Sequence, residues 1–320
     1  MFWRFSKVFA ASFQLLLMFV VAESQSSKTD SFFVRSNLLV TDGSKNNVYG
    51  LTKSDFTLYE NDVVQPITYF AHRQGPLNVA ILTDNSGSMR GQMKLISSFG
   101  KQIVSNLATG DEAQIIRFVG REAISVEQEW TAEKVKLSSA FDDQFLEGGQ
   151  SAVTDAVYVA VEDIIKRYDK RKDARYAVVL FSDCEDRDSY YSAKQLIKLI
   201  GKRDIPIHVI TQLGDFHRSE KVVQRIRILS NYFATRTGGS SFILASDAKK
   251  SEVQAALDSI LLELRSPYVL GYVSTNLKLN ENNPARTLRI FANDGPNGEK
   301  RSLNHKSYVA MPFDQTSIDN

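Results

Sequence analysis

The chain has 320 residues, more than one hydrophobic core usually serves, so we expect one large domain and a smaller companion. Lys and Arg number 39 against 37 Asp and Glu, and the formal charge of +2 is too small to favour a nucleic-acid partner. The single cysteine, Cys184, excludes an intramolecular disulfide, and no cysteine or histidine cluster has zinc spacing. Any bound metal should therefore be held by oxygen.

The N-terminus has the pattern of an export signal. Arg4 and Lys7 precede a mostly apolar run from Val8 to Ala22, and small residues follow where a signal peptidase would cleave. The alternative is an uncleaved membrane anchor, but the run is shorter than the roughly 20 residues that a spanning helix requires. We therefore predict a signal peptide over residues 1–24 and a secreted or periplasmic protein with no membrane span in the mature chain.

Both ends of the mature chain have the character of antiparallel β-structure. Residues 25–75 and 266–320 contain short apolar segments separated by turns rich in Asn, Asp and Gly. The strands we expect there are residues 32–40, 55–60, 64–70, 268–274, 287–291 and 306–311. Because the ends of a compact domain commonly lie close together, these strands are expected to form one small β-sandwich-like unit.

Between them, residues 76–265 alternate short runs rich in Val and Ile with longer amphipathic segments of helical period. This pattern is typical of an α/β domain with a doubly wound, mostly parallel sheet covered by helices on both faces. The expected strands are residues 78–83, 112–119, 123–127, 176–182, 207–211 and 241–244. The expected helices are residues 92–107, 131–141, 154–168, 192–203, 222–237 and 251–265.

Oxygen-bearing side chains follow two of these strands and open one helix. Asp84, Ser86 and Ser88 come directly after the first strand, Ser151 follows a Gly-Gly pair before a helix, and Asp183 follows the fourth strand. In doubly wound sheets, ligands bind outside the carboxyl ends of the strands, so these side chains are expected to meet there. The competing interpretation is a set of ordinary helix N-caps, since Asp and Ser are favoured in that position.

Two carboxylates and three hydroxyls suit a hard divalent cation, which we expect to be Mg²⁺, with Ca²⁺ or Mn²⁺ as alternatives. Neutral hydroxyls leave such an ion electrophilic, so that it can accept a further oxygen, ideally an Asp or Glu carboxylate from a protein partner. Asn85, Asp155 and Glu185 lie nearby in the sequence and are expected to support the site rather than bind the ion. Glu185, Asp186 and Asp188 form an acidic loop beside the site, which is interpreted as a solvated charged turn that would also raise the local cation concentration.

These residues resemble the metal-ion-dependent adhesion site of von Willebrand factor type A domains. The segment from Asp55 to Asp62, Asp-Phe-Thr-Leu-Tyr-Glu-Asn-Asp, and the segment from Leu264 to Tyr272 resemble more closely an exported bacterial family termed VWFA-related, known chiefly from Acidobacteria. The resemblance covers residues 32–310, almost the whole mature chain. It implies that the three serines contact the ion directly, and that the two aspartates act directly or through water.

Two positions depart from the family pattern. Ser151 stands where threonine is more common, which keeps the hydroxyl but loses the methyl group that restricts its rotamer, so ion affinity should fall slightly. Cys184 stands where glycine is usual, and a positive φ at this position would strain the loop and disturb Asp183.

Binding rather than catalysis is the predicted function. The sequence contains no serine-nucleophile elbow and no phosphate-binding loop. Cys184 is not expected to act as a nucleophile, because neighbouring carboxylates would raise the pKa of its thiol. Two alternatives stay open: a hydrolase that uses an ion-activated water, and an envelope component in which the ion is merely structural.

Overall fold

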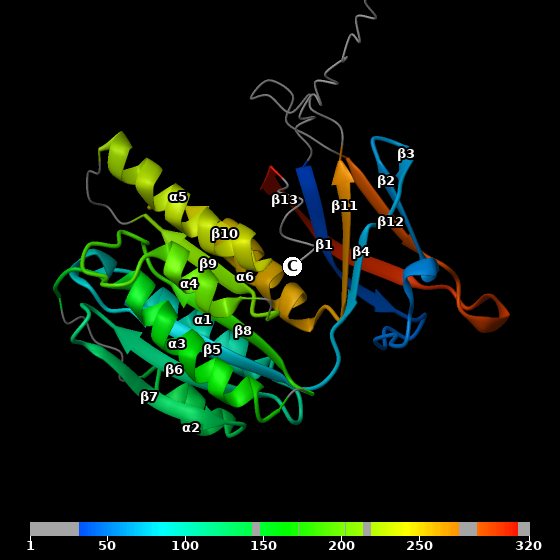
Figure 1. The fold of residues 1–320 in the computed structure, drawn as a ribbon. Coiled ribbons are helices and arrows are strands. Elements are labelled where there is room, and N and C mark those ends of the chain that lie inside the picture. Colours follow the sequence, from blue (N-terminus) through cyan, green and yellow to red (C-terminus); the bar gives the residue numbers. More distant parts are fainter. Residues whose placement is uncertain are drawn as a thin grey trace, which may run out of the picture.

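The computed structural model describes residues 32–142, 148–171, 173–201, 203–213, 219–274 and 287–312, so the predicted signal peptide lies outside the described residues. Within those ranges, no helix combines the length and the apolar character needed to cross a membrane. Figure 1 shows two units side by side, an α/β unit and an antiparallel β unit.

A six-stranded sheet forms the centre of the α/β unit, in the order β10-β9-β8-β5-β6-β7. Five strands are parallel, and only β7 runs antiparallel to its neighbour, β6. This confirms the predicted α/β fold with a mostly parallel sheet. The connection from β6 to β7 is too short for a crossover helix, so β7 can only return antiparallel. The strands are β5 (Leu77–Asp84), β6 (Glu112–Phe118), β7 (Ile124–Thr131), β8 (Arg175–Phe181), β9 (Ile207–Gln212) and β10 (Ser241–Leu244).

Helices cover both faces of this sheet because alternate residues of each parallel strand point to opposite sides. Val79 and Ile81 of β5 pack with α1, α2 and α6, whereas Ala80 and Leu82 pack with α3, α4 and α5. All four side chains are fully buried. The helices are α1 (Met93–Ser105), α2 (Lys134–Ser139), α3 (Val153–Tyr168), α4 (Ala193–Ile200), α5 (Glu220–Thr237) and α6 (Lys250–Arg265).

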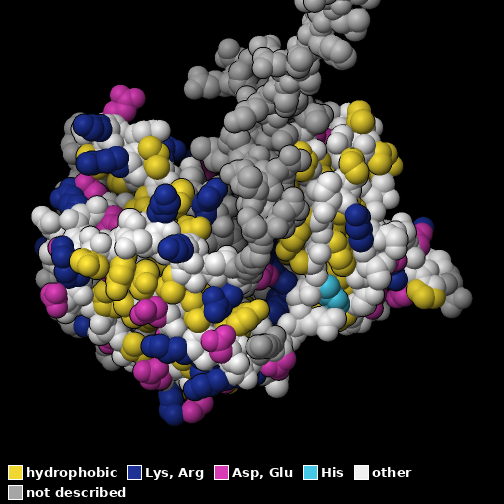
Figure 2. All heavy atoms as spheres, in the orientation of Figure 1, with side chains coloured by type: hydrophobic (Ala, Val, Ile, Leu, Met, Phe, Trp, Pro, Cys, Tyr) yellow, Lys and Arg dark blue, Asp and Glu magenta, His cyan; other side chains and the backbone are white. Residues whose placement is uncertain are grey.

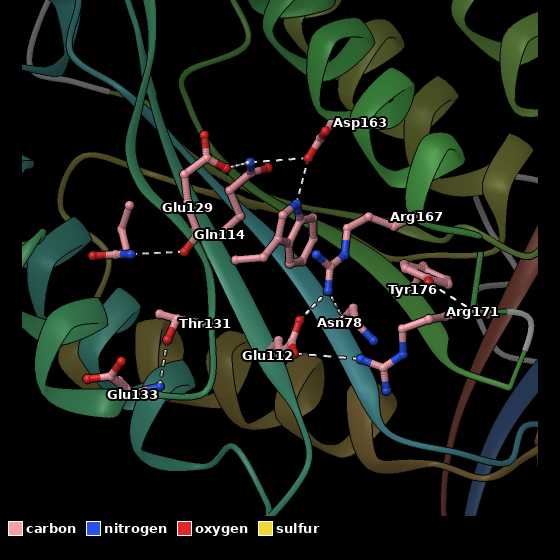
Figure 3. A network of polar contacts seen from close by, with 12 residues as sticks. Asn78, Glu112, Gln114, Glu129, Thr131, Glu133, Asp163, Arg167, Arg171 and Tyr176 are labelled. Carbon is pink, nitrogen blue, oxygen red and sulfur yellow. Dashed lines mark hydrogen bonds and ion pairs between the residues drawn. The ribbon is translucent and has the colours of Figure 1, made fainter. Parts of the chain in front are cut away.

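Polar contacts fix the C-terminal half of α3 to the sheet (Figure 3). The indole of Trp130 on β7 donates a 2.5 Å hydrogen bond to Asp163, which also accepts from Gln114 on β6 at 3.2 Å. Arg167 donates to Asn78 of β5 at 3.2 Å and pairs with Glu112. Because α3 is held at this end, its first turn at the other end of the sheet has a defined position.

The antiparallel unit joins strands from both ends of the chain. One sheet has the order β13-β1-β11-β4 and the other the order β12-β2-β3. Their apolar faces share a core that includes Leu38, Leu58, Tyr268 and Tyr272. The strands are β1 (Phe32–Thr41), β2 (Phe56–Glu60), β3 (Val63–Gln65), β4 (Tyr69–His72), β11 (Tyr268–Ser274), β12 (Leu288–Ala292) and β13 (Ser302–Pro312).

The prediction of a single strand over residues 64–70 is wrong. This segment forms the end of β3 and the start of β4, which belong to different sheets. Pro66 lies between them, and because proline has no backbone N–H it cannot continue a hydrogen-bonded ladder. The chain changes sheets at this residue.

The two units meet at the edge of the central sheet where its parallel strands begin. Arg73, which follows β4, donates to both oxygens of Asp204 at 2.5 and 2.7 Å, and Arg35 on β1 lies 3.7 Å from the same carboxylate. Arg35 also packs on Gly238, where an added Cβ would come within 1.6 Å of its guanidinium. The loops that carry the predicted site lie at the opposite edge, where the parallel strands end.

Candidate functional site

The first loop of the candidate site begins where β5 ends. Asp84 is the last residue of β5 and is fully buried, and its Oδ1 accepts a 2.9 Å hydrogen bond from the backbone N–H of Ser86. Ser86 precedes a 3₁₀ turn, Gly87–Met89, that turns the chain so that the hydroxyls of Ser86 and Ser88 lie 3.1 Å apart. The three predicted side chains of this loop therefore face one small region.

Ser151 enters the same region from the loop before α3. Its hydroxyl lies 3.1 Å from Oδ2 of Asp84 and 2.8 Å from the hydroxyl of Ser86. Gly148 and Gly149 precede it with φ angles of 86° and 91°, a conformation that a side chain would strain. Four of the five predicted residues are thus joined by direct polar contacts, although Ser151 is separated from Asp84 by 67 positions.

The loop after β8 supplies the remaining carboxylate and an additional hydroxyl. Asp183 is fully buried, and its Oδ1 accepts the backbone N–H of Glu185 at 3.0 Å. Ser182 donates a 2.6 Å hydrogen bond to Oδ2 of Asp84. Ser182 was not among the predicted site residues. Ser182 comes directly after an apolar strand, and this position could have identified it, because residues that follow the parallel strands lie at the same edge of the sheet.

The charge of this cluster favours a cation. Burial, followed by the negative charge of Asp183, raises the pKa of Asp84 to about 6. Among the described residues, no Lys, Arg or His side chain forms an ion pair with Asp84, so hydroxyl and amide groups alone stabilise this buried carboxylate. A buried carboxylate without a counter-charge is costly, and a divalent cation would remove that cost.

The donor types also fit a hard cation. In the described part of the chain, no three His, Cys, Asp or Glu side chains come together in a way that could hold a metal. An ion at this edge would therefore combine the two aspartates with serine hydroxyls, an all-oxygen set of the kind that Mg²⁺, Ca²⁺ and Mn²⁺ accept.

Cys184 adopts the strained backbone conformation anticipated from the sequence, with φ of 55°. Its thiol is buried and accepts a 3.4 Å hydrogen bond from Thr211. Burial, more than the charges of Asp183 and Asp84, raises the pKa of this thiol to about 12, so the thiolate is suppressed. The loop nevertheless keeps Asp183 buried and close enough for its charge to act on Asp84.

The three neighbouring residues support the loops by different contacts. Both carboxylate oxygens of Asp155 accept backbone N–H groups, from Tyr190 and Tyr191, at 2.8 Å each. Glu185 pairs with Arg187 on the same loop. Asn85 is buried, and its backbone N–H donates to the carbonyl of Phe118 at the end of β6, at 2.8 Å.

The interpretation of the acidic loop as a solvated turn is wrong for Asp186, whereas Asp188 stays partly exposed in an ion pair. Asp186 accepts the backbone N–H groups of Val153 and Thr154 at 3.1 and 3.3 Å and the hydroxyl of Thr154 at 2.6 Å, so it caps the N-terminus of α3. Asp188 binds the backbone and the guanidinium of Arg121. The contacts of Asp186 tie the loop after β8 to the first turn of α3, and those of Asp188 tie it to the connection between β6 and β7. The cap of α3 therefore comes from a distant part of the chain.

The sequence of the α/β unit is similar to that of a known domain family. The sequence profile of the von Willebrand factor type A domain matches residues 78–256, more than half of the chain. No curated protein sequence matches. The prediction of the exported Acidobacteria-type subfamily stays a prediction.

Solved structures are similar at low sequence identity. The protein BatB from Bacteroides thetaiotaomicron is 16% identical, with 57% of this chain and 96% of that chain covered and a TM-score of 0.44. An aerotolerance-related membrane protein from Bacteroides fragilis is 17% identical, with 59% and 98% covered and a TM-score of 0.45. Proximal thread matrix protein 1 from the mussel byssus, in a structure described as having a zinc-occupied MIDAS motif, is 17% identical, with 64% and 49% covered and a TM-score of 0.45.

Proposed function

The chain belongs to the von Willebrand factor type A domain family, and from this premise we propose that it is an exported binding protein that engages a protein partner through a divalent cation. Asp84, Ser86, Ser88, Ser151 and Asp183 would hold the ion, with Mg²⁺ as the first candidate and Ca²⁺ or Mn²⁺ as alternatives. When bound, the ion would supply a positive, electrophilic centre for an Asp or Glu carboxylate of the partner.

One observation carries this proposal: a fully buried carboxylate, Asp84, is surrounded by hydroxyls from three loops and has no cationic side chain as a partner among the described residues. A set of ordinary helix caps would not need this convergence, because each cap serves its own helix. Here Ser86 and Ser151 contact each other and Asp84 instead, and Asp186 caps α3.

The arrangement of the two units supports binding at this edge. We place the α/β domain at residues 76–265, with the β unit built from residues 25–75 and 266–320 attached at the edge where the parallel strands begin. The loops of the candidate site therefore lie at the free edge (Figure 1). Basic and acidic side chains are interspersed over the face of the α/β unit in Figure 2, without the extended basic surface of a nucleic-acid-binding protein.

Export is part of the proposal and rests on residues 1–24, which have the features of a cleaved signal peptide. A secreted or periplasmic location would expose the protein to envelope or extracellular partners. Processing can be checked by N-terminal sequencing of the protein recovered from the culture medium or the periplasm.

Two measurements test the proposed function. Calorimetric titration of the purified protein with Mg²⁺, Ca²⁺ and Mn²⁺ should give a single site, which Asp84→Ala abolishes and Asp258→Asn, a change on the outer face of α6, leaves intact. Partner capture from an envelope extract should then be lost with excess EDTA and with Asp84→Ala. Retention of the same partner in excess EDTA would reject the mechanism.

The alternatives give different results in the same experiments. If the ion is only structural, chelation lowers the melting temperature but removes no specific partner. A hydrolase needs a general base or a nucleophile, and the thiol nearest to the site, Cys184, has its pKa raised to about 12 by burial and is unsuited to that role. Binding is therefore the better supported function.

A further inference from the structure

A second polar site lies at the opposite edge of the central sheet, where the two connections between the units run. A cavity of about 340 Å³ is lined there by Tyr49, Arg73, Gln74, Arg175 and Arg265. Its lining contains three guanidinium groups and no carboxylate side chain. Like charges repel, so an anion among these guanidinium groups would be favourable.

The three arginines come from separate parts of the fold. Arg73 lies in the connection from β4 to β5, Arg175 is the first residue of β8, and Arg265 is the last residue of α6. The chain holds them close together: the backbone N–H of Arg175 donates to Pro76 at 2.8 Å, and that of Arg73 donates to Pro267 at 2.6 Å. Their convergence is therefore a product of the tertiary structure.

Two of the three guanidinium groups are neutralised by carboxylates outside the cavity lining. Arg73 binds both oxygens of Asp204, and Arg265 donates to Asp111 at 2.6 Å. Arg175 differs from them. It donates only to backbone carbonyls, to Gly75 and to Leu264 at 3.1 Å each, and within the described chain it forms no ion pair.

Arg175 therefore brings a positive charge without a direct ion-pair partner among the described residues to a partly enclosed space, and Asp111, the carboxylate whose charge favours it, is bound to Arg265. Burial and then the charge of Arg73 lower the pKa of Arg175, so its surroundings disfavour its charged form. An anion placed in the cavity would relieve this repulsion and would take hydrogen bonds from guanidinium N–H groups, which match the oxygens of phosphate and carboxylate.

We propose that this cavity, lined by Arg73, Arg175 and Arg265, binds a small oxyanion that carries at least two negative charges, of the phosphate or dicarboxylate type. The hydroxyl of Tyr49 and the amide of Gln74 are further donors in the lining. The size of the cavity admits inorganic phosphate or a compact dicarboxylate. Because the site joins both connections between the units, an anion bound there also links the β unit to the α/β unit.

This site is independent of the proposed metal site. Asp84 and Leu77 stand at opposite ends of β5, so the two sites are separated by roughly 23 Å, the length of an eight-residue strand. All measurements are therefore made with the full mature chain in excess EDTA, so that phosphate cannot bind through a cation at the other edge.

The test is calorimetric titration with inorganic phosphate and, separately, with malonate. We expect saturable binding of at least one, weakened when chloride rises from 50 to 200 mM. Arg175→Gln should lower the affinity at least tenfold, whereas Arg236→Gln, a matched change on the surface of α5, should leave it unchanged. Tighter binding of phosphate indicates a phosphate-bearing ligand, and tighter binding of malonate indicates a dicarboxylate.

Gln74→Glu keeps the proposal testable if Arg175→Gln does not fold. Gln74 is exposed, and its side chain contacts His72 at 2.9 Å, so this change leaves the hydrogen bonds of Arg175 to Gly75 and Leu264 in place. The new carboxylate would face the same positive charge and should reduce anion affinity at least tenfold while the protein stays folded. Absence of binding by both anions, or equal affinities of Gln74→Glu and Arg236→Gln, would overturn the proposal.

Discussion

Replacement of Asp84 by asparagine should stabilise the metal-free protein, and this advantage over the wild-type protein should largely disappear when the metal ion is bound. The pKa of Asp84 is raised from 3.8 to about 6 in the folded protein, a difference of about 2 units. At 1.36 kcal/mol per unit, ionised Asp84 costs the metal-free protein about 3 kcal/mol at neutral pH. Asparagine resembles the protonated acid in shape and charge, so Asp84→Asn should recover about this amount.

The sign of the pH dependence follows from proton binding. Between pH 3.8 and about 6 the folded protein holds a proton on Asp84 that the unfolded chain has released. The free energy of unfolding of the metal-free protein should therefore fall as pH rises through this window, and should be constant with respect to this group above it. Asp84→Asn removes the effect, because the amide does not titrate.

The assay is thermal unfolding at pH 8 in EDTA and in saturating Mg²⁺. In EDTA, Asp84→Asn should melt roughly 6–12 °C above the wild-type protein. In Mg²⁺ at about 100 times its dissociation constant, the wild type should gain about 2.7 kcal/mol and the variant nothing. If Asp84→Asn is no more stable than the wild type in EDTA, or if both respond equally to Mg²⁺, the buried carboxylate is not the cation ligand that we describe.

Three further changes test the loops. Cys184 has φ of 55°, so Cys184→Gly should be about 1 kcal/mol more stable than Cys184→Ala, which loses the same sulfur but keeps the strain; equal unfolding free energies would show that this conformation costs nothing. Asp186→Ala removes the cap of α3 and should cost about 1–2 kcal/mol in denaturant unfolding, with weaker Mg²⁺ binding because Ser151 is adjacent; a stability loss with unchanged Mg²⁺ affinity would separate the cap from the site. Ser151→Ala should weaken Mg²⁺ binding at least tenfold in calorimetry, whereas Ser151→Thr should retain it; equal affinities would remove Ser151 from the ligand set.

Local sequence patterns were sufficient to predict most of the α/β fold. Strand β5, Leu77–Asp84, is buried on both faces, and such strands have short continuous apolar runs that are visible without a structure. Helices with one apolar face show the 3.6-residue period in the same way. The single strand predicted over residues 64–70 failed because the apolar pattern continues across Pro66, while the missing N–H at that residue ends one ladder and allows the next strand to join another sheet.

The residues of the candidate site also fall into two groups, those that the sequence could identify and those that it could not. Asp84, Ser86 and Asp183 could be chosen from the sequence, because each stands at or just after the end of an apolar strand and parallel strands end at one edge of a sheet. The roles of Ser182 and Asp186 could not, because their partners, Asp84 and the first turn of α3, lie about 100 and about 30 positions away. A hydrogen bond between such distant positions leaves no periodic trace in the sequence.

The sequence by itself determined the elements, the all-oxygen chemistry of the candidate ion site and the family, because these depend on residue type and local spacing. Only the tertiary structure decided that Asp84 is buried without a cationic partner, that Asp186 caps a helix from another loop, and that Arg175 faces two further arginines across a cavity. Burial and net local charge arise from the whole surroundings of a group, and those surroundings are assembled from segments that only folding brings together.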